Sequence, residues 1–103
     1  MDRQAVETSR APAALGPYSQ AIVAGGLVFC SGTAGIDPQT GTAPDGIEAQ
    51  TEQALTNLAA VLEAAGSSLS DLVKTTIFYA DVDDAGTDAA LEAAAALLRS
   101  RTA

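Results

Sequence analysis

The chain has 103 residues, enough for one small domain, and carries a net charge of −8 from 13 acidic and 5 basic side chains. This acidic balance argues against binding to nucleic acid or to anionic membranes, since both carry negative charge. The sequence has no histidine and one cysteine, which excludes a catalytic histidine dyad, a zinc site of histidines or thiolates, and an internal disulfide.

The N-terminal third predicts an arm and a hairpin. The first dozen residues read as an extended arm, and two short strands are expected at 18–23 and 27–32. The pair Gly25-Gly26 between them tolerates positive φ and predicts a tight turn. Because the second strand is an apolar run, we expect it to be buried and Cys30 to be a plain buried thiol.

Residues 36–41 predict a turn. Asp37 can accept a hydrogen bond from the backbone that follows it, and Gly41 can close the turn. The segment lacks the Gly-Lys-Ser/Thr ending of a phosphate-binding loop, so we interpret it as a turn and not as a nucleotide site.

The clearest predicted element is a helix that follows this turn. Asp45 is a candidate N-cap with Glu48 three residues on, as in a capping box, and Gly66 is a candidate C-terminal stop. Polar residues, among them Asn57, are expected to face away from the core. The apolar stripe at helical spacing consists of Ile47, Leu55, Leu58, Val61, Leu62 and Ala65.

The last third predicts a strand and a second helix. Residues 72–80 are β-branched and aromatic on both faces, which favours a central strand. Asp81, Asp83 and Asp84 then open a helix, and we interpret them as capping groups in preference to metal ligands. The stripe of this helix consists of Ala90, Leu91, Ala94, Leu97 and Leu98. The order of elements predicts an α/β domain with a mixed sheet and helices on one face.

The expected core is light, because many apolar residues are alanines and the chain has two Phe, two Tyr and no Trp. Burying one face against identical subunits would add to it, so composition favours an oligomer. No segment resembles a signal peptide or a membrane span, and we expect a cytoplasmic protein.

Four segments, in this order, carry a resemblance to a known family: Gly16-Pro17-Tyr18-Ser19-Gln20-Ala21, Phe29-Cys30-Ser31-Gly32, Asp37-Pro38-Gln39-Thr40-Gly41 and Asp71-Leu72-Val73-Lys74-Thr75-Thr76-Ile77-Phe78. They resemble the reactive intermediate deaminase family, also called RidA or YjgF and often labelled endoribonuclease L-PSP, from about residue 9 to residue 84. The resemblance implies a chorismate-mutase-like fold with two helices on one face of the sheet, built as a homotrimer with clefts between subunits. It also implies hydrolysis of enamines and imines such as 2-aminoacrylate to 2-keto acids and ammonia, with no metal and no organic cofactor.

The same resemblance places Tyr18, Ser31 and the backbone amide of Gly32 on one wall of the cleft. These groups suit the reaction, because an amide stabilises developing negative charge and a phenol or hydroxyl orients water or moves a proton. Without the resemblance, a serine that bonds nearby backbone at a strand end and an ordinary core aromatic would be the favoured explanation.

The chain departs from the family near its C-terminal end. The single domain over 1–103 is short at that end. Family members continue into two closing strands, which carry a carboxylate-binding arginine and a glutamate assigned to the water. Arg101 is the candidate for that arginine, and a cation at a helix C-terminus is the alternative; the glutamate has no counterpart. Three readings stay open: a truncated member with impaired catalysis, a divergent member that completes its cleft differently, or a piece of a longer protein.

Two rival functions follow. The missing glutamate favours a non-catalytic trimer that binds small carboxylates or regulates a partner. RNA cleavage or translation inhibition, which the family label suggests, ranks last because the chain is acidic and has no histidine. The expected partners are therefore small 2-imino and 2-keto acids and further copies of the chain, not nucleic acid or a membrane.

Overall fold

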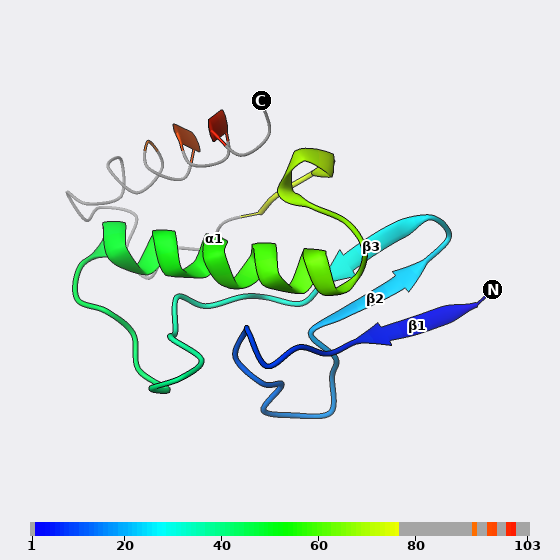
Figure 1. Ribbon diagram of the computed structural model, residues 1–103, viewed down its shortest axis with the longest axis horizontal. Coiled ribbons are helices and arrows are strands. Elements are labelled where there is room, and N and C mark those ends of the chain that lie inside the picture. Colours follow the sequence, from blue (N-terminus) through cyan, green and yellow to red (C-terminus); the bar gives the residue numbers. More distant parts are fainter. Residues whose placement is uncertain (1, 77–91, 93–94, 97–98, 101–103) are drawn as a thin grey trace.

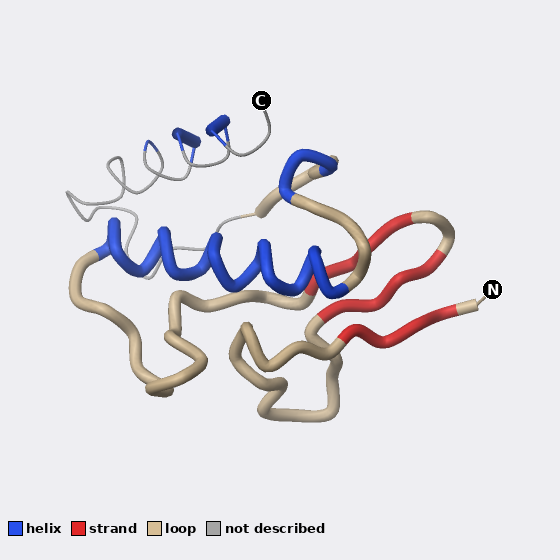
Figure 2. Tube along the Cα trace, in the orientation of Figure 1, coloured by secondary structure: helices blue, strands red, loops and turns tan. Residues whose placement is uncertain are grey.

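The computed structural model describes residues 2–76, 92, 95–96 and 99–100. Within this part of the chain, a three-stranded antiparallel sheet is covered on one face by a long helix, so the domain is of the α/β class (Figure 1). The elements are β1 (Arg3–Val6), β2 (Ala21–Ala24), β3 (Leu27–Cys30), α1 (Ile47–Ala64) and a 3-10 turn η1 (Leu69–Asp71). Long irregular segments join β1 to β2 and β3 to α1 (Figure 2).

The predicted hairpin is confirmed, with shorter strands than expected. β2 and β3 are joined by Gly25 and Gly26, whose φ angles are 58° and 78°. Positive φ at both central residues matches the twist of the two strands and is a conformation that glycine adopts without steric cost. Residues 18–20 and 31–32 lie outside the strands, because other contacts described below use their backbone and side chains.

The prediction that the first dozen residues form an extended arm is wrong at β1. Arg3–Val6 is a strand that pairs antiparallel with β2, with Val6 opposite Ala21. Only Val6 in this strand is buried, so the segment shows no alternation of apolar and polar residues that would mark a strand. The strand exists because β2 offers a free edge for its backbone.

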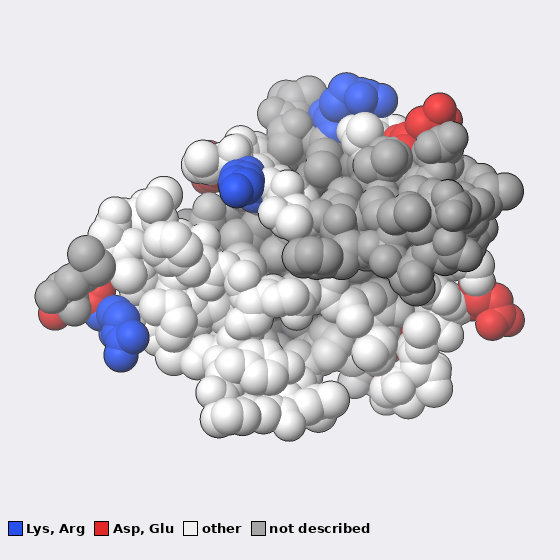
Figure 3. Space-filling model, turned by 180° about the vertical axis from the view of Figure 1, so that it is seen from behind, with Lys and Arg blue, Asp and Glu red and all other residues white. Residues whose placement is uncertain are grey.

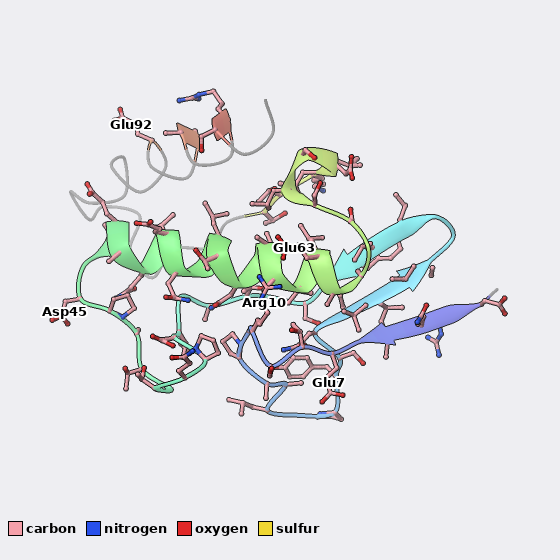
Figure 4. The ribbon with its side chains drawn as sticks, viewed as in Figure 1. Glu7, Arg10, Asp45, Glu63 and Glu92 are labelled. Carbon is pink, nitrogen blue, oxygen red and sulfur yellow. The ribbon has the colours of Figure 1, made fainter. Side chains whose placement is uncertain are left out.

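The end of α1 is confirmed, but its predicted start is wrong. Gly46, with φ 89°, occupies the N-cap, and no side chain caps the helix; Asp45 lies on the preceding loop (Figure 4). Gly66, with φ 83°, ends the helix as predicted. The Gly66 and Ser67 amides donate to carbonyls of the last turn at 3.0 and 2.8 Å, which is a Schellman motif.

The turn after β3 is confirmed. The Asp37 carboxylate accepts a hydrogen bond from the Gln39 amide at 2.8 Å, and the Gly41 amide donates to the Asp37 carbonyl at 2.8 Å. Gly41 has φ 72°, which explains the glycine at this position.

The core lies between α1 and one face of the sheet. Val6, Ala11, Ala21 and Val61 form the buried cluster. Of the predicted stripe of α1, Leu55, Val61 and Leu62 are buried, while Ile47, Leu58 and Ala65 are half-buried. The expectation that Asn57 faces away from the core is wrong, because its side chain is fully buried.

The other face of the sheet is open, which corrects the expectation of a buried second strand. Leu27 is 49% exposed and Phe29 is 58% exposed, and Cys30 is exposed as well. Register places Phe29 beside Ile22 and Leu27 beside Ala24, so these four residues share the open face. α1 covers only the opposite face, and β3 is an edge strand within the described residues.

Residues 72–76 belong to no strand, so the predicted central strand is not seen over this part of 72–80. Val73 is 85% exposed, and none of the described strands pairs with the segment. Residues 77–80, the aspartate cluster and the apolar stripe of the second predicted helix lie outside the described residues. Of that helix the structure describes Glu92, Ala95–Ala96 and Arg99–Ser100, which are helical. Among the described residues, no helix is long and apolar enough to cross a bilayer.

Candidate functional site

A small cleft brings together the three site residues that the sequence predicted. Tyr18, Ser31 and Gly32 all line a hollow of about 160 Å³, which we call the Tyr18 cleft. Its walls come from the segment around Pro12 and from the loop that runs from Thr33 to Ile36. This volume lies below the ~300–1,000 Å³ typical of pockets for drug-sized ligands, so the cleft suits a molecule of a few heavy atoms.

Ser31 directs its hydroxyl proton away from any ligand. The Ser31 hydroxyl donates to the Ser19 carbonyl at 2.6 Å, and the Ser31 amide donates to the Gln20 carbonyl at 3.0 Å. The lone pairs of the hydroxyl oxygen stay available. Ser31 is therefore built to accept a hydrogen bond from a water molecule or an N–H group, not to attack as a nucleophile.

Tyr18 has the opposite polarity. Its phenol oxygen accepts a hydrogen bond from the Leu15 amide at 3.3 Å, which leaves the phenol proton free to donate. Its own amide donates to the Gly16 carbonyl at 2.8 Å, so the residue lies in a tight turn and not in a strand. The side chain is 51% exposed, so the phenol can reach both a ligand and solvent.

Gly32 leaves its backbone open to the cleft. A side chain carbon placed on Gly32 would meet nothing within 4 Å. The Gly32 amide has no hydrogen-bond partner among the residues that the structure describes. A free amide beside Ser31 can donate to a carboxylate or to an oxygen that gains negative charge.

Sequence reasoning missed a buried carboxamide on one side of the cleft, Gln20. Its side-chain oxygen accepts from the Thr8 amide at 2.7 Å, and its nitrogen donates to the carbonyls of Thr8, Ala11 and Pro12 at 3.1, 3.3 and 2.8 Å. The residue is 8% exposed. The strand predicted over 18–23 gave no hint of this contact, because neither Gln20 nor Tyr18 lies in a strand.

A second buried carboxamide, Asn57, holds the opposite wall. Its nitrogen donates to the carbonyls of Ala34 and Ile36 at 3.0 and 2.8 Å, and its oxygen accepts from Gln53 at 2.9 Å. Gly35, between the two carbonyls, lies so close to α1 that a side chain carbon there would collide with the Gln50 carbonyl. The sequence does hold a signal for this contact, because Asn57 stands one helical turn before Val61 of the predicted stripe.

A larger and more open hollow of about 550 Å³ adjoins the cleft and shares Tyr18 and Gln20 with it. It is lined by the end of β1, the segment that follows it and Pro38. It contains neither Ser31 nor Gly32. We therefore place the candidate site in the smaller cleft, where donors and acceptors converge.

No cation lines the Tyr18 cleft within the described part of the chain. Arg10 is engaged elsewhere, because its guanidinium pairs with Glu63 on α1 at 2.9 Å (Figure 4). On the face shown in Figure 3, the blue Lys and Arg side chains stand singly and form no basic patch. Arg101, the predicted carboxylate-binding residue, lies outside the described residues.

The remaining reactive groups are sparse. Among the described residues, no group of three or more His, Cys, Asp or Glu could hold a metal ion. Cys30 is exposed, yet desolvation raises the pKa of its thiol above the ordinary value, so the thiol is protonated near neutral pH. It does not line the cleft.

The fold and site define a small α/β domain with a cleft in which a phenol, a hydroxyl and a backbone amide converge. The profile of the family described as Endoribonuclease L-PSP matches residues 8–102. The chain therefore belongs to this family, the RidA/YjgF family, as the four sequence segments predicted.

Named relatives share the domain. The chain is 52% identical over 83 residues to Reactive Intermediate Deaminase A, chloroplastic, of Arabidopsis thaliana, covering 80% of this chain and 44% of that one. It is 44% identical over 86 residues to 2-iminobutanoate/2-iminopropanoate deaminase of Mus musculus, and the match covers 82% of this chain and 64% of that one. The chain thus spans less than two thirds of the length of these relatives.

Solved structures agree with this relationship. RidA from a Psychrobacter species superposes with a TM-score of 0.83 at 41% identity, covering 90% of this chain and 74% of that one. TdcF of E. coli, solved with bound serine, superposes with a TM-score of 0.87 at 37% identity, and the match covers 97% of this chain and 77% of that one.

Proposed function

We propose that the chain hydrolyses small imine and enamine acids of the 2-iminopropanoate class to 2-keto acids and ammonia. The observation that carries the proposal is the Tyr18 cleft. It combines a free phenol proton, a hydroxyl oxygen that can only accept and an open backbone amide in about 160 Å³. Relatives at 44% identity named 2-iminobutanoate/2-iminopropanoate deaminase support the choice of substrate.

The reaction asks little of the protein. Water adds to the C=N carbon, its proton passes to nitrogen, and the carbinolamine then expels ammonia as its hydroxyl becomes the keto oxygen. The imine carbon is already electrophilic, so positioning the water and moving protons are the main tasks.

Each group in the cleft suits one of these tasks. The Ser31 hydroxyl oxygen accepts a hydrogen bond from the attacking water, because its own proton is held by the Ser19 carbonyl. The Tyr18 phenol donates to the imine or leaving nitrogen. The Gly32 amide donates to the substrate carboxylate.

The cleft needs a cation for the substrate carboxylate, and we propose that a neighbouring subunit completes it in a homotrimer of chorismate-mutase-like fold. The open sheet face supports this assembly, because Leu27 and Phe29 are large apolar side chains about half exposed to water. Arg101 is our candidate for the cation. A bidentate guanidinium is the natural partner of a carboxylate.

Release of ammonia from freshly generated 2-aminoacrylate tests the activity. The variant Tyr18→Phe keeps the ring and removes the phenol, and we expect it to lose about 10²–10⁴-fold in rate, the usual contribution of a proton-transfer group. Ser70→Ala is the matched control, because Ser70 is an exposed serine bonded only to Ser68. A wild-type rate equal to the buffer blank, in a folded oligomer, would refute the proposed reaction.

Sedimentation velocity tests the assembly. Phe29→Ser removes an exposed apolar side chain from the open face and should shift the protein toward monomer. Val73→Ser is the control, because Val73 is 85% exposed, belongs to none of the described strands and does not line the cleft. An unchanged sedimentation coefficient for Phe29→Ser, or a monomeric wild type, would contradict the proposed trimer.

A non-catalytic binding module is the second candidate. One observation favours it: no carboxylate and no cation line the cleft within the described residues. Calorimetry with 2-ketobutyrate, run beside the deaminase assay, separates the two candidates, since binding without turnover supports the module.

A further inference from the structure

We propose that two buried side-chain amides, Gln20 and Asn57, are positioning residues that hold the two walls of the Tyr18 cleft and thereby set the ligand length it accepts. The inference rests on the proposed function for its ligand class. It concerns residues that do not react, and it has a readout that needs no ligand.

The first wall is fixed by Gln20. Its carboxamide makes four hydrogen bonds to the backbone of residues 8–12 and is 8% exposed. Ala11 and Pro12 line the cleft, and the Gln20 carboxamide binds both of their carbonyls. The Gln20 carbonyl also accepts from the Ser31 amide at 3.0 Å. One residue therefore fixes the wall relative to the catalytic candidate Ser31.

The second wall is fixed by Asn57. Its carboxamide binds the carbonyls of Ala34 and Ile36, both lining residues, and the side chain is fully buried. Gly35 lets this loop touch the backbone of α1, so the wall rests directly on the helix. Gln53, one turn earlier, donates to the Asn57 oxygen and fixes the orientation of the amide.

A carboxamide suits this task better than an apolar residue would. The irregular wall segments form no ladder with a strand, so their buried and partly buried carbonyls need side-chain donors. Several short hydrogen bonds leave the wall one position, whereas apolar contacts alone tolerate small shifts. A shift of about 1 Å in a reacting geometry can cost a factor of 10² in rate, so small shifts matter.

The test uses Gln20→Met and Asn57→Ala, with Gln50→Met as control. Gln50 is an exposed residue on α1 whose carboxamide bonds to the Pro44 carbonyl and does not line the cleft; only its backbone, which the substitution keeps, touches Gly35. Calorimetry measures affinity for pyruvate, 2-ketobutyrate and 2-ketohexanoate. We expect the ratio of long- to short-chain affinity to change about fourfold or more in both cleft variants, since one buried methylene is worth about 0.8 kcal/mol, or roughly fourfold. A purely structural role would lower the melting temperature and leave this ratio unchanged.

The ligand-free readout is the amide spectrum. In Gln20→Met, the Thr8 amide loses its acceptor, so its hydrogen exchange should accelerate at least tenfold and the Ser31 and Gly32 signals should move. If the Met variant does not fold, Asn57→Ala is the second variant, and the same Ser31 and Gly32 signals are measured. If the wild type binds no keto acid, the proposed ligand class fails and these signals alone decide. Unmoved Ser31 and Gly32 signals in a folded variant, or an unchanged affinity ratio in both variants, would overturn the inference.

Discussion

Truncation of Asn57 to alanine is the sharpest test of the structure itself. The side chain is fully buried and makes three hydrogen bonds, two of them to the carbonyls of Ala34 and Ile36. Alanine removes the donors and leaves both carbonyls unpaired. A buried polar group without a partner costs about 1–3 kcal/mol.

The expected loss lies at the lower end of that range for each carbonyl. Ala34 is exposed and Ile36 is half-buried, so water can reach part of the vacated site. Two carbonyls at about 1 kcal/mol each, and a similar cost for the lost third bond, give about 3 kcal/mol. The better helix propensity of alanine returns roughly 0.5 kcal/mol, so the net destabilisation is about 2.5 kcal/mol.

Thermal unfolding followed by circular dichroism measures this loss. For a domain of this size, 1 kcal/mol corresponds to a shift of about 4–8 °C, so the melting temperature should fall by roughly 10–20 °C. Gln50→Ala removes one exposed carboxamide from the same helix and should shift it by less than about 4 °C. Protein concentration must be held equal, because an oligomer melts in a concentration-dependent way. Equal shifts for the two variants would show that Asn57 does not hold the loop.

Three further predictions follow from single contacts. Arg10→Met should change the free energy of unfolding by less than about 1 kcal/mol, because its ion pair with Glu63 is mostly exposed; urea titration at low and high salt checks this, and a larger loss would contradict it. Gly26→Ala should lower the free energy of unfolding by about 1 kcal/mol or more, because φ is 78° at this residue; a melting temperature equal to that of the wild type would contradict this. Iodoacetamide should alkylate Cys30 with a pH midpoint above that of the urea-unfolded chain, because desolvation raises the thiol pKa and the reactive thiolate forms only at higher pH; coincident midpoints would refute this.

Local chemistry was readable from the sequence where one residue decides one conformation. Gly25-Gly26 predicted the hairpin, Asp37 predicted the turn at residues 36–41, and Gly66 predicted the end of α1. Each prediction succeeded because positive φ and short polar side chains act over a few residues. The start of α1 was misread for a similar reason. Asp45 has the chemistry of a cap, but the chain enters the helix through the left-handed Gly46 one residue later.

The candidate site was found in part. Tyr18, Ser31 and Gly32 were named from the resemblance, and the structure brings them into one cleft. Gln20 was missed, although it stands two residues from Tyr18, because a buried amide and a surface amide look alike in sequence. The open face of the sheet was also missed, since an apolar run does not reveal which of its sides is covered.

The sequence by itself determined the family, the α/β class and the identities of the groups that can do chemistry, because these depend on residue types at fixed spacing. Only the tertiary structure decided how those groups act. The Ser31 proton is held by the Ser19 carbonyl, and the cleft walls are fixed by Gln20 and Asn57. These bonds join residues 8 to 23 positions apart, and such pairings exist only after the sheet and α1 have packed together.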